Sequence, residues 1–171
     1  MESNLIYAKP SEDSDERYTP DYAVYPLIPY IPEGSIVWCP FDTQESAFVR
    51  VLSQHTHVVH SHISGGEDFY TYEPPKYDMI ISNPPFRNKR LILGRVLGLG
   101  KPFALLMTIV WLNDSGPFTF LEQGGQFMLF DKRIHYKLPD GSTQKKTTFS
   151  SAYYCRYFLP DRVVPVRLTR T

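Results

Sequence analysis

The sequence predicts an α/β protein in which helices cover both faces of an open, mainly parallel sheet. Short runs that are apolar on both sides of a strand, above all 102–111, alternate with segments of helical periodicity. Strands of this kind are buried on both faces, which favours parallel pairing through crossover helices. The aromatic segments 126–137 and 147–159, joined through a Pro-Asp-Gly turn at 139–141, predict an antiparallel hairpin that ends or edges the sheet.

The individual elements follow from apolar spacing and from turn residues. An apolar run at 36–39 stops at Pro40, and a helical pattern opens at Asp42, whose side chain we expect to cap the first amide groups while Glu45 reaches back. Further strands are expected over 57–63, 77–82 and 102–111, and a further helix over 88–99. Residues 1–17 are polar and acidic and predict a flexible arm, which leaves a single folded domain over 18–171.

Composition excludes several classes of protein. A chain of 171 residues with 42% hydrophobic and 15% aromatic residues describes one compact domain with an ample core. No apolar run approaches the roughly 20 residues that cross a bilayer, and the amino-terminus lacks a secretory pattern, so we expect a cytoplasmic protein without membrane contact. Cys39 and Cys155 form no Cys-x-x-Cys motif, so we expect both to be reduced.

The charges separate along the chain although the net charge is zero. Residues 1–86 carry thirteen acids and four bases, whereas residues 87–171 carry five acids and fourteen bases. This asymmetry is compatible with a nucleic-acid face, and it is equally compatible with solvated side chains on helix and hairpin surfaces. The candidates for such a face are Arg87, Lys89, Arg90, Lys132, Arg133, Lys145 and Lys146.

The most specific motif lies at the carboxyl end of a predicted buried strand and reads Asn83, Pro84, Pro85, Phe86. Both prolines lack an N–H and Pro84 holds Asn83 extended, so the corner is rigid and presents acceptors that no local donor occupies. The Asn83 side-chain oxygen and the Pro84 carbonyl can each accept a hydrogen from the amino group of adenine, which orients its nitrogen to attack a methyl group. Phe86 would stack on the base, which a duplex must extrude.

With this motif the chain resembles the N6-adenine DNA methyltransferases, which use S-adenosylmethionine and carry (Asp/Asn/Ser)-Pro-Pro-(Tyr/Phe) at this place. Among them it looks like the short, phage-type enzymes. The resemblance implies a Rossmann-like class I methyltransferase fold, a mainly parallel seven-stranded sheet whose last strand is antiparallel. It also implies that Tyr18, Thr19 and Pro20 contact the amino-acid end of the cofactor, and that Asp68 and Phe69, which follow the family's third strand, contact its adenine.

The cofactor loop after the first strand departs from the family's pattern. It usually reads acid-Pro-x-x-Gly-x-Gly, with glycines that let the backbone approach the ligand. Here Cys39 and Pro40 open a loop that has no glycine up to residue 45. The backbone must therefore approach the cofactor differently, and Asp42 or Glu45 is the candidate partner of the methionine ammonium.

The second strand also lacks the acid that holds the cofactor's ribose in the family. The chain offers His60, Ser61 or His62 in its place, each with weaker hydrogen bonds than a carboxylate. The histidines do not predict a metal site, because no cysteine is near and His57 and His60 fall on opposite faces of a strand.

The sequence favours one function and leaves two others open. The main expectation is transfer of a methyl group from S-adenosylmethionine to the adenine amino group in DNA. An RNA substrate is the second, because the same tetrapeptide serves other exocyclic amines. The third is a non-catalytic nucleic-acid or protein-binding module that has lost cofactor affinity, which the glycine-free loop motivates. At about 170 residues the chain has no room for a separate recognition domain, so the target is simple, the specificity is loose or a partner subunit reads the sequence.

Overall fold

The computed structural model describes residues 17–110, 112, 115–144 and 149–170. The predicted amino-terminal arm lies outside these residues except for Arg17, and so do Trp111, Lys145 and Lys146. No helix in the described part of the chain is long and apolar enough to cross a membrane.

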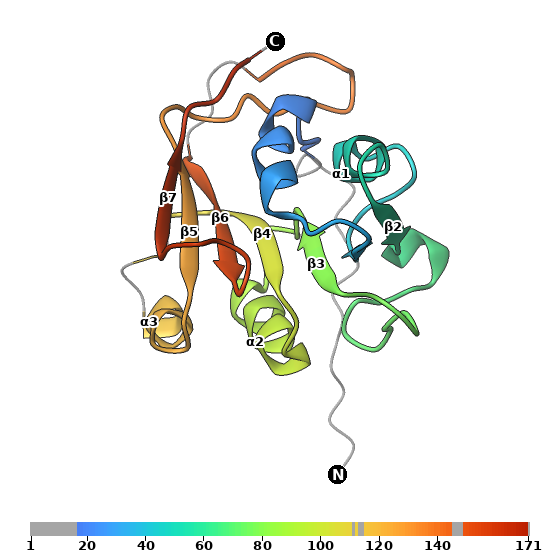
Figure 1. Cartoon of the computed structure of the whole chain (residues 1–171). Coiled ribbons are helices and arrows are strands. Elements are labelled where there is room, and N and C mark those ends of the chain that lie inside the picture. Colours follow the sequence, from blue (N-terminus) through green and yellow to red (C-terminus); the bar gives the residue numbers. More distant parts are fainter. Residues whose placement is uncertain (1–16, 111, 113–114, 145–148, 171) are drawn as a thin grey trace.

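A seven-stranded mixed sheet forms the centre of the molecule (Figure 1). Its strands are β1 (Ile36–Cys39), β2 (His57–His60), β3 (Met79–Ser82), β4 (Phe103–Thr108), β5 (Gln126–Phe130), β6 (Ser151–Arg156) and β7 (Val163–Val166). Their spatial order is β2-β1-β3-β4-β6-β5-β7. Only β6 runs against its neighbours, since every other pairing is parallel. The carboxyl ends of six strands therefore share one edge of the sheet.

Helical elements cover both faces of this sheet (Figure 1). The α-helices are α1 (Ala47–Leu52), α2 (Lys89–Leu99) and α3 (Ser115–Glu122), and the 3-10 helices are η1 (Asp21–Ala23), η2 (Tyr25–Tyr30) and η3 (Ile63–Gly65). Along β4, Ala104 and Leu106 face a core cluster shared with η1, η2 and α1, whereas Phe103 and Leu105 face a second cluster shared with α2 and α3. This alternation is the expected side-chain period of a strand buried on both faces.

The predicted mainly parallel sheet with an antiparallel hairpin is confirmed in outline. β5 and β6 pair antiparallel, and Met128 faces Tyr153. Between them, the Pro-Asp-Gly segment forms a local turn in which Gly141 N donates to Leu138 O at 2.9 Å. The strand expected over 77–82 begins two residues later, and the one expected over 102–111 ends at Thr108.

Several predicted boundaries are wrong, and two elements were not predicted. The strand from His57 ends at His60 rather than at residue 63, and residues 61–78 contain η3 but no strand, so the Asp68-Phe69 loop lies between η3 and β3. α3 and β7 were not predicted from sequence. β7 adds a parallel edge strand beside β5, so the sheet reaches seven strands by extension at its carboxyl-terminal side.

Candidate functional site

Asn83 leaves the carboxyl end of β3 and turns its side chain towards Thr19. Its Nδ2 donates a hydrogen bond to Thr19 Oγ1 at 3.1 Å, and the threonine is only 8% exposed. The other amide atom, Oδ1, is buried and has no hydrogen-bond partner. A buried acceptor without a donor costs about 1–3 kcal/mol, so it calls for a physical reason. The structure thus brings the Tyr-Thr-Pro and Asn-Pro-Pro-Phe segments together and leaves one acceptor open.

The prolines and Phe86 continue this corner. Pro84 is buried and Pro85 is exposed. Phe86 is half-buried, and its ring centroid lies 5.0 Å from that of Phe149 and 6.4 Å from that of Tyr136, both in edge-to-face arrangement. Edge-to-face packing holds the Phe86 ring from the side.

The loop after β1 lies beside the end of β3, because the two strands are neighbours in the sheet. Asp42 in this loop is 5% exposed, and its carboxylate accepts a hydrogen bond from the Ser82 hydroxyl, next to Asn83. Burial raises the pKa of Asp42 to about 6, although the hydrogen bonds from Ser82 and Ser46 act in the opposite direction. A buried carboxylate with a raised pKa lacks a cation, so a positively charged ligand group would stabilise it.

The expectation that Asp42 caps a helix is wrong. α1 begins at Ala47 with Ser46 in the N-cap position, and the Ser46 hydroxyl accepts from Thr43 N at 3.0 Å. Asp42 is instead tied to β3 and, through its own N–H, to Ser61 O at 3.2 Å. An aspartate can serve either as a helix cap or as a buried acceptor. Here the parallel pairing of β1 with β3 brings Asp42 beside Ser82, so it serves as a buried acceptor.

Cys39 and Pro40 are the buried residues at the start of this loop. The Cys39 side chain belongs to the core, and burial, with a contribution from the Asp42 charge, raises the pKa of its thiol well above the usual value. Pro40 is buried as well. At these two positions the loop after β1 can therefore offer only backbone atoms to a ligand.

The three polar candidates for a ribose contact have different environments. Ser61 is fully buried and accepts a hydrogen bond from Trp38 Nε1 at 2.9 Å, so the fold uses its hydroxyl. His62 Nδ1 lies 2.7 Å from Ser64 Oγ. His60 is exposed at the carboxyl end of β2, where its Nε2 lies 3.1 Å from Gln44 Oε1. Of the three, His60 is the most exposed.

Asp68 and Phe69 lie in the loop between η3 and β3. Asp68 is half-buried, and its Oδ1 accepts from Tyr70 N at 2.9 Å. The Phe69 ring is 3% exposed and packs against Phe41 with centroids 4.6 Å apart, while the Arg95 guanidinium lies 5.3 Å from its centre. Phe69 is thus a core residue beneath the loop. Among the described residues, no group of three His, Cys, Asp or Glu side chains could hold a metal ion.

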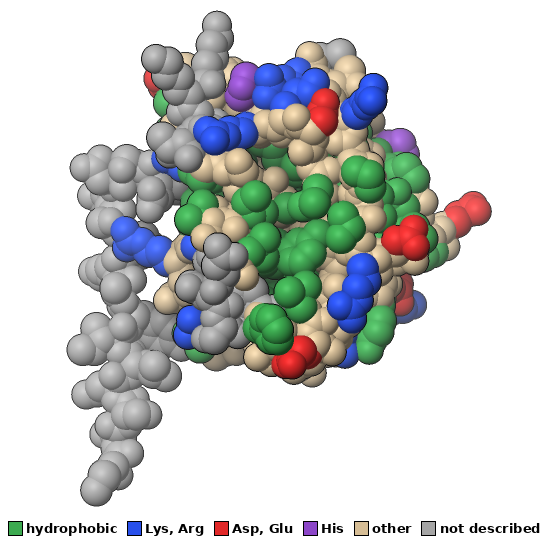
Figure 2. Space-filling view, turned by 90° about the vertical axis from the view of Figure 1, so that its left-hand side faces the viewer, with side chains coloured by type: hydrophobic (Ala, Val, Ile, Leu, Met, Phe, Trp, Pro, Cys, Tyr) green, Lys and Arg blue, Asp and Glu red, His purple; other side chains and the backbone are tan. Residues whose placement is uncertain are grey.

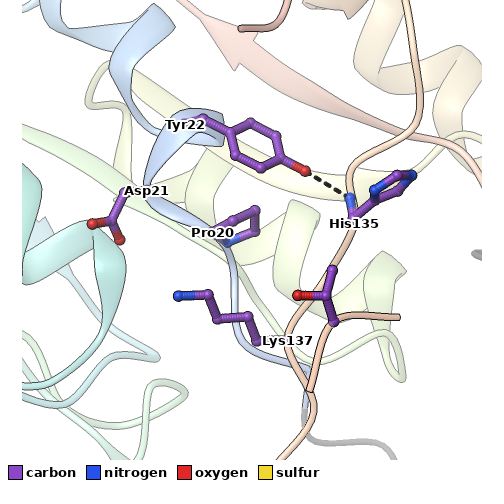
Figure 3. Close-up of a pocket in the computed structure, with 6 residues that line it drawn as sticks. Pro20, Asp21, Tyr22, His135 and Lys137 are labelled. Atoms are coloured by element: carbon purple, nitrogen blue, oxygen red, sulfur yellow. Dashed lines mark hydrogen bonds between the residues drawn. The ribbon is translucent and has the colours of Figure 1, made fainter. Parts of the chain in front are cut away.

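A small pocket lies beside the segment that directly follows Thr19 (Figure 3). Its lining residues are Pro20, Asp21, Tyr22, His135, Lys137 and Thr143. The Tyr22 hydroxyl accepts from His135 N at 2.8 Å, and Tyr18 exchanges two backbone hydrogen bonds of 2.9 Å with Lys137. Tyr18 itself is 49% exposed. These contacts anchor segment 131–144 beside Thr19, a neighbourhood that the sequence did not indicate.

Comparisons with known proteins show the fold and no family. No protein-family description and no curated protein sequence matches the chain. A solved structure, the methyltransferase subunit of a type I restriction-modification system from Streptococcus thermophilus, is similar with a TM-score of 0.50 and 11% identity. The similarity covers 91% of this chain and 48% of that protein, so the chain spans about half its length. The chain has a methyltransferase-like Rossmann fold.

Proposed function

We propose that the protein transfers the methyl group of S-adenosylmethionine to the exocyclic amino group of adenine in DNA. The observation that carries this proposal is the buried, unpartnered Oδ1 of Asn83 at the carboxyl end of β3. Ligands of open α/β sheets bind at this edge, and an incoming N–H would satisfy the acceptor. The similar restriction-modification methyltransferase subunit supports the choice of DNA as substrate.

In this proposal the protein orients an amine that is otherwise a weak nucleophile. Asn83 Oδ1 and the Pro84 carbonyl each accept one N–H of the amino group, while Thr19 holds the Asn83 carboxamide in place. Orientation of this kind lowers the barrier because the reacting atoms meet in a near-attack geometry. Phe86 packs against the base, extruded from the duplex. Bound S-adenosylmethionine would supply the methyl group from its sulfonium and leave as the neutral thioether S-adenosylhomocysteine, while the amine nitrogen would release one proton to solvent water.

The residues around Asp42 fit a cationic cofactor. S-adenosylmethionine carries a sulfonium and an ammonium, and no cationic side chain is among the groups that shift the pKa of the buried Asp42 carboxylate. In the resembling family, glycines let the backbone approach the cofactor closely. Here a charge interaction between Asp42 and the cofactor ammonium would take the place of that close approach. In this proposal the exposed His60 side chain at the end of β2 contacts the cofactor ribose. Asp68 accepts a hydrogen bond from the amino group of the cofactor adenine.

The decisive experiment is transfer of tritiated methyl from S-adenosylmethionine to DNA. Asn83→Ala is expected to lower the rate by about 10²–10³-fold, the range seen when one preorganised hydrogen-bonding group is removed. Asn88→Gly is the matched control, because Asn88 is exposed, has a φ of 60° and makes no side-chain cap. Wild-type activity in Asn83→Ala would refute the proposed role of this residue. Label that enters tRNA rather than DNA would move the substrate to RNA.

One observation favours a second candidate function, a non-catalytic binding module. The loop from Cys39 to Ser46 carries a side chain at every position, where the resembling enzymes use glycines. Calorimetry with S-adenosylmethionine separates the two. Binding at micromolar concentration is expected for the enzyme, whereas no heat from the folded protein would favour the module.

A further inference from the structure

Cationic side chains follow the two strands that form one side of the sheet. β5 is followed by Lys132 and Arg133, and β7 by Arg167 and Arg170, all of them exposed. We call these four residues the β5–β7 cationic surface. Because β5 and β7 are parallel to each other and to β1–β4, this surface lies at the same edge of the sheet as Asn83. In Figure 2, Lys and Arg side chains gather at the top of this side, above a mostly apolar face.

The β5–β7 cationic surface is built into the fold. Leu168 is 3% exposed in the core, and its N–H donates to Asp131 Oδ1 at 2.9 Å. The Arg170 guanidinium donates to the carbonyl of Arg133. These contacts fix residues 167–170 against the segment after β5, and an ordered set of cations loses little conformational entropy when it binds an anion. One carboxylate lies among them, that of Asp131, 3.5 Å from Lys132 Nζ.

A short stretch of chain connects this surface with Asn83. Residues 132–137 span at most about 18 Å when extended, and Lys137 is held against Tyr18 by two backbone hydrogen bonds. Thr19, which follows Tyr18 in the chain, accepts the hydrogen bond from Asn83. One DNA strand carries a phosphate about every 3.4 Å, so this distance corresponds to at most about five phosphates.

We propose that the β5–β7 cationic surface, continued by Lys137, binds the phosphate backbone of DNA beside the base that enters the Asn83 site. The inference rests on the proposed function and names the surface that holds its substrate. Phosphate contacts position a protein on nucleic acid without reading its sequence. An acidic protein is the alternative partner, and the line of cations that leads to Asn83 favours DNA.

The test compares two double variants of exposed cations from opposite ends of the strands. Lys132→Ala with Arg167→Ala removes cations that follow β5 and β7, whereas Lys76→Ala with Arg162→Ala removes cations that precede β3 and β7. Binding of the full chain to a fluorescent duplex of about 20 base pairs is measured by anisotropy over a series of salt concentrations. The first variant is expected to bind about tenfold more weakly at low salt, and its slope of log K against log salt is expected to be about 2 units shallower. The second is expected to match wild type.

Each outcome decides the proposal. Equal affinity and salt slope in wild type and the Lys132/Arg167 variant, or no DNA binding by wild type, would overturn it. Loss of binding to polyglutamate with unchanged DNA binding would assign the surface to an acidic protein. Methyl transfer measured in parallel separates this inference from the function on which it rests. If the Lys132/Arg167 variant binds DNA more weakly but wild type shows no methylation, only the proposed function is refuted. If both variants methylate DNA at the wild-type rate, only the role of the surface is refuted.

Discussion

The side chain of Asn83 donates a hydrogen bond to the hydroxyl of Thr19 at 3.1 Å, across 64 residues of chain. With this bond in place, the carboxamide oxygen is the atom left without a partner. Thr19 is buried and contributes no charge. We therefore regard it as a positioning residue for the proposed reaction, acting through Asn83.

Thr19→Val is expected to lower kcat for DNA methylation about fivefold, because the loss of one hydrogen bond of roughly 1 kcal/mol frees the carboxamide to rotate. The KM for DNA is expected to stay unchanged, since Thr19 lies behind Asn83 rather than on a charged surface. Thr19→Ser keeps the hydroxyl and is expected to recover most of the rate. Initial rates under saturating cofactor measure both variants. A loss of rate in Thr19→Ser equal to that in Thr19→Val would show that the hydroxyl alone does not position Asn83.

Asp42 is expected to destabilise the protein without ligand at neutral pH. Its pKa is raised from 3.8 to about 6 by burial, so between these values the folded state holds a proton that the unfolded state has lost, and stability falls as pH rises. Above about pH 6 the cost is constant, about 3 kcal/mol for a shift of about two units. Asp42→Asn is therefore expected to raise the free energy of unfolding at pH 8 and to change it little at pH 3.5. Urea unfolding across this pH range measures the difference.

The same substitution is expected to weaken S-adenosylmethionine binding, because the neutral amide cannot pair with an ammonium. Calorimetry at pH 8 measures this loss, and Glu45→Gln is the control, since Glu45 is an exposed acid of the same loop. A variant that is both less stable at pH 8 and unchanged in cofactor affinity would contradict the assignment of Asp42. Weaker binding in Glu45→Gln alone would transfer the ammonium contact to that residue.

Much of the fold follows from apolar spacing, and the missed elements share one cause. β1, β3, β4 and α2 were all predicted; the bounds of β1 agree, and those of the other three differ by at most three residues. β7 was missed because Pro165 argues against a strand, yet an edge strand tolerates a residue without an N–H. α3 was missed because Gly116 and Pro117 indicate a turn, although proline is accepted in the first turn of a helix. In both cases the effect of a proline depends on where it lies in the element, at a sheet edge or in the first turn of a helix. The local sequence pattern does not show that position.

The candidate site was predicted only in part, because its contacts join distant segments. The family resemblance assigned Thr19 to the cofactor and Asn83 to the base, and it did not predict the hydrogen bond between them. The Asp42–Ser82 contact depends on the order of strands in the sheet, and the placement of Lys137 beside Tyr18 depends on the long connection between β5 and β6. A sequence gives the residue types for such contacts but not the pairing.

Two glycine substitutions are expected to have opposite effects on stability. A Cβ at Gly125 would lie 2.6 Å from the Phe120 ring and 2.7 Å from its backbone oxygen. Gly125→Ala is therefore expected to destabilise the protein by about 1–3 kcal/mol through overpacking. Gly98 lies inside α2 with no atom within 4 Å of its position for a Cβ, so Gly98→Ala is expected to stabilise by about 0.5–1 kcal/mol through helix propensity. Thermal unfolding measures both, and a stabilising Gly125→Ala would contradict the close approach of α3 to β5.

The last prediction concerns how Phe86 is held. Its ring meets that of Phe149 edge-on, with centroids 5.0 Å apart and planes at 70°, a contact worth about 0.5–1.5 kcal/mol. If this contact orients Phe86 for the base, Phe149→Leu should raise the KM for DNA about threefold to tenfold, and it should add nothing once Phe86→Leu is present. Phe118→Leu, at a ring that is 63% exposed on α3, is the control and should leave KM unchanged. Additive effects of the Phe86 and Phe149 substitutions in this double-mutant cycle would mean that the two rings act independently.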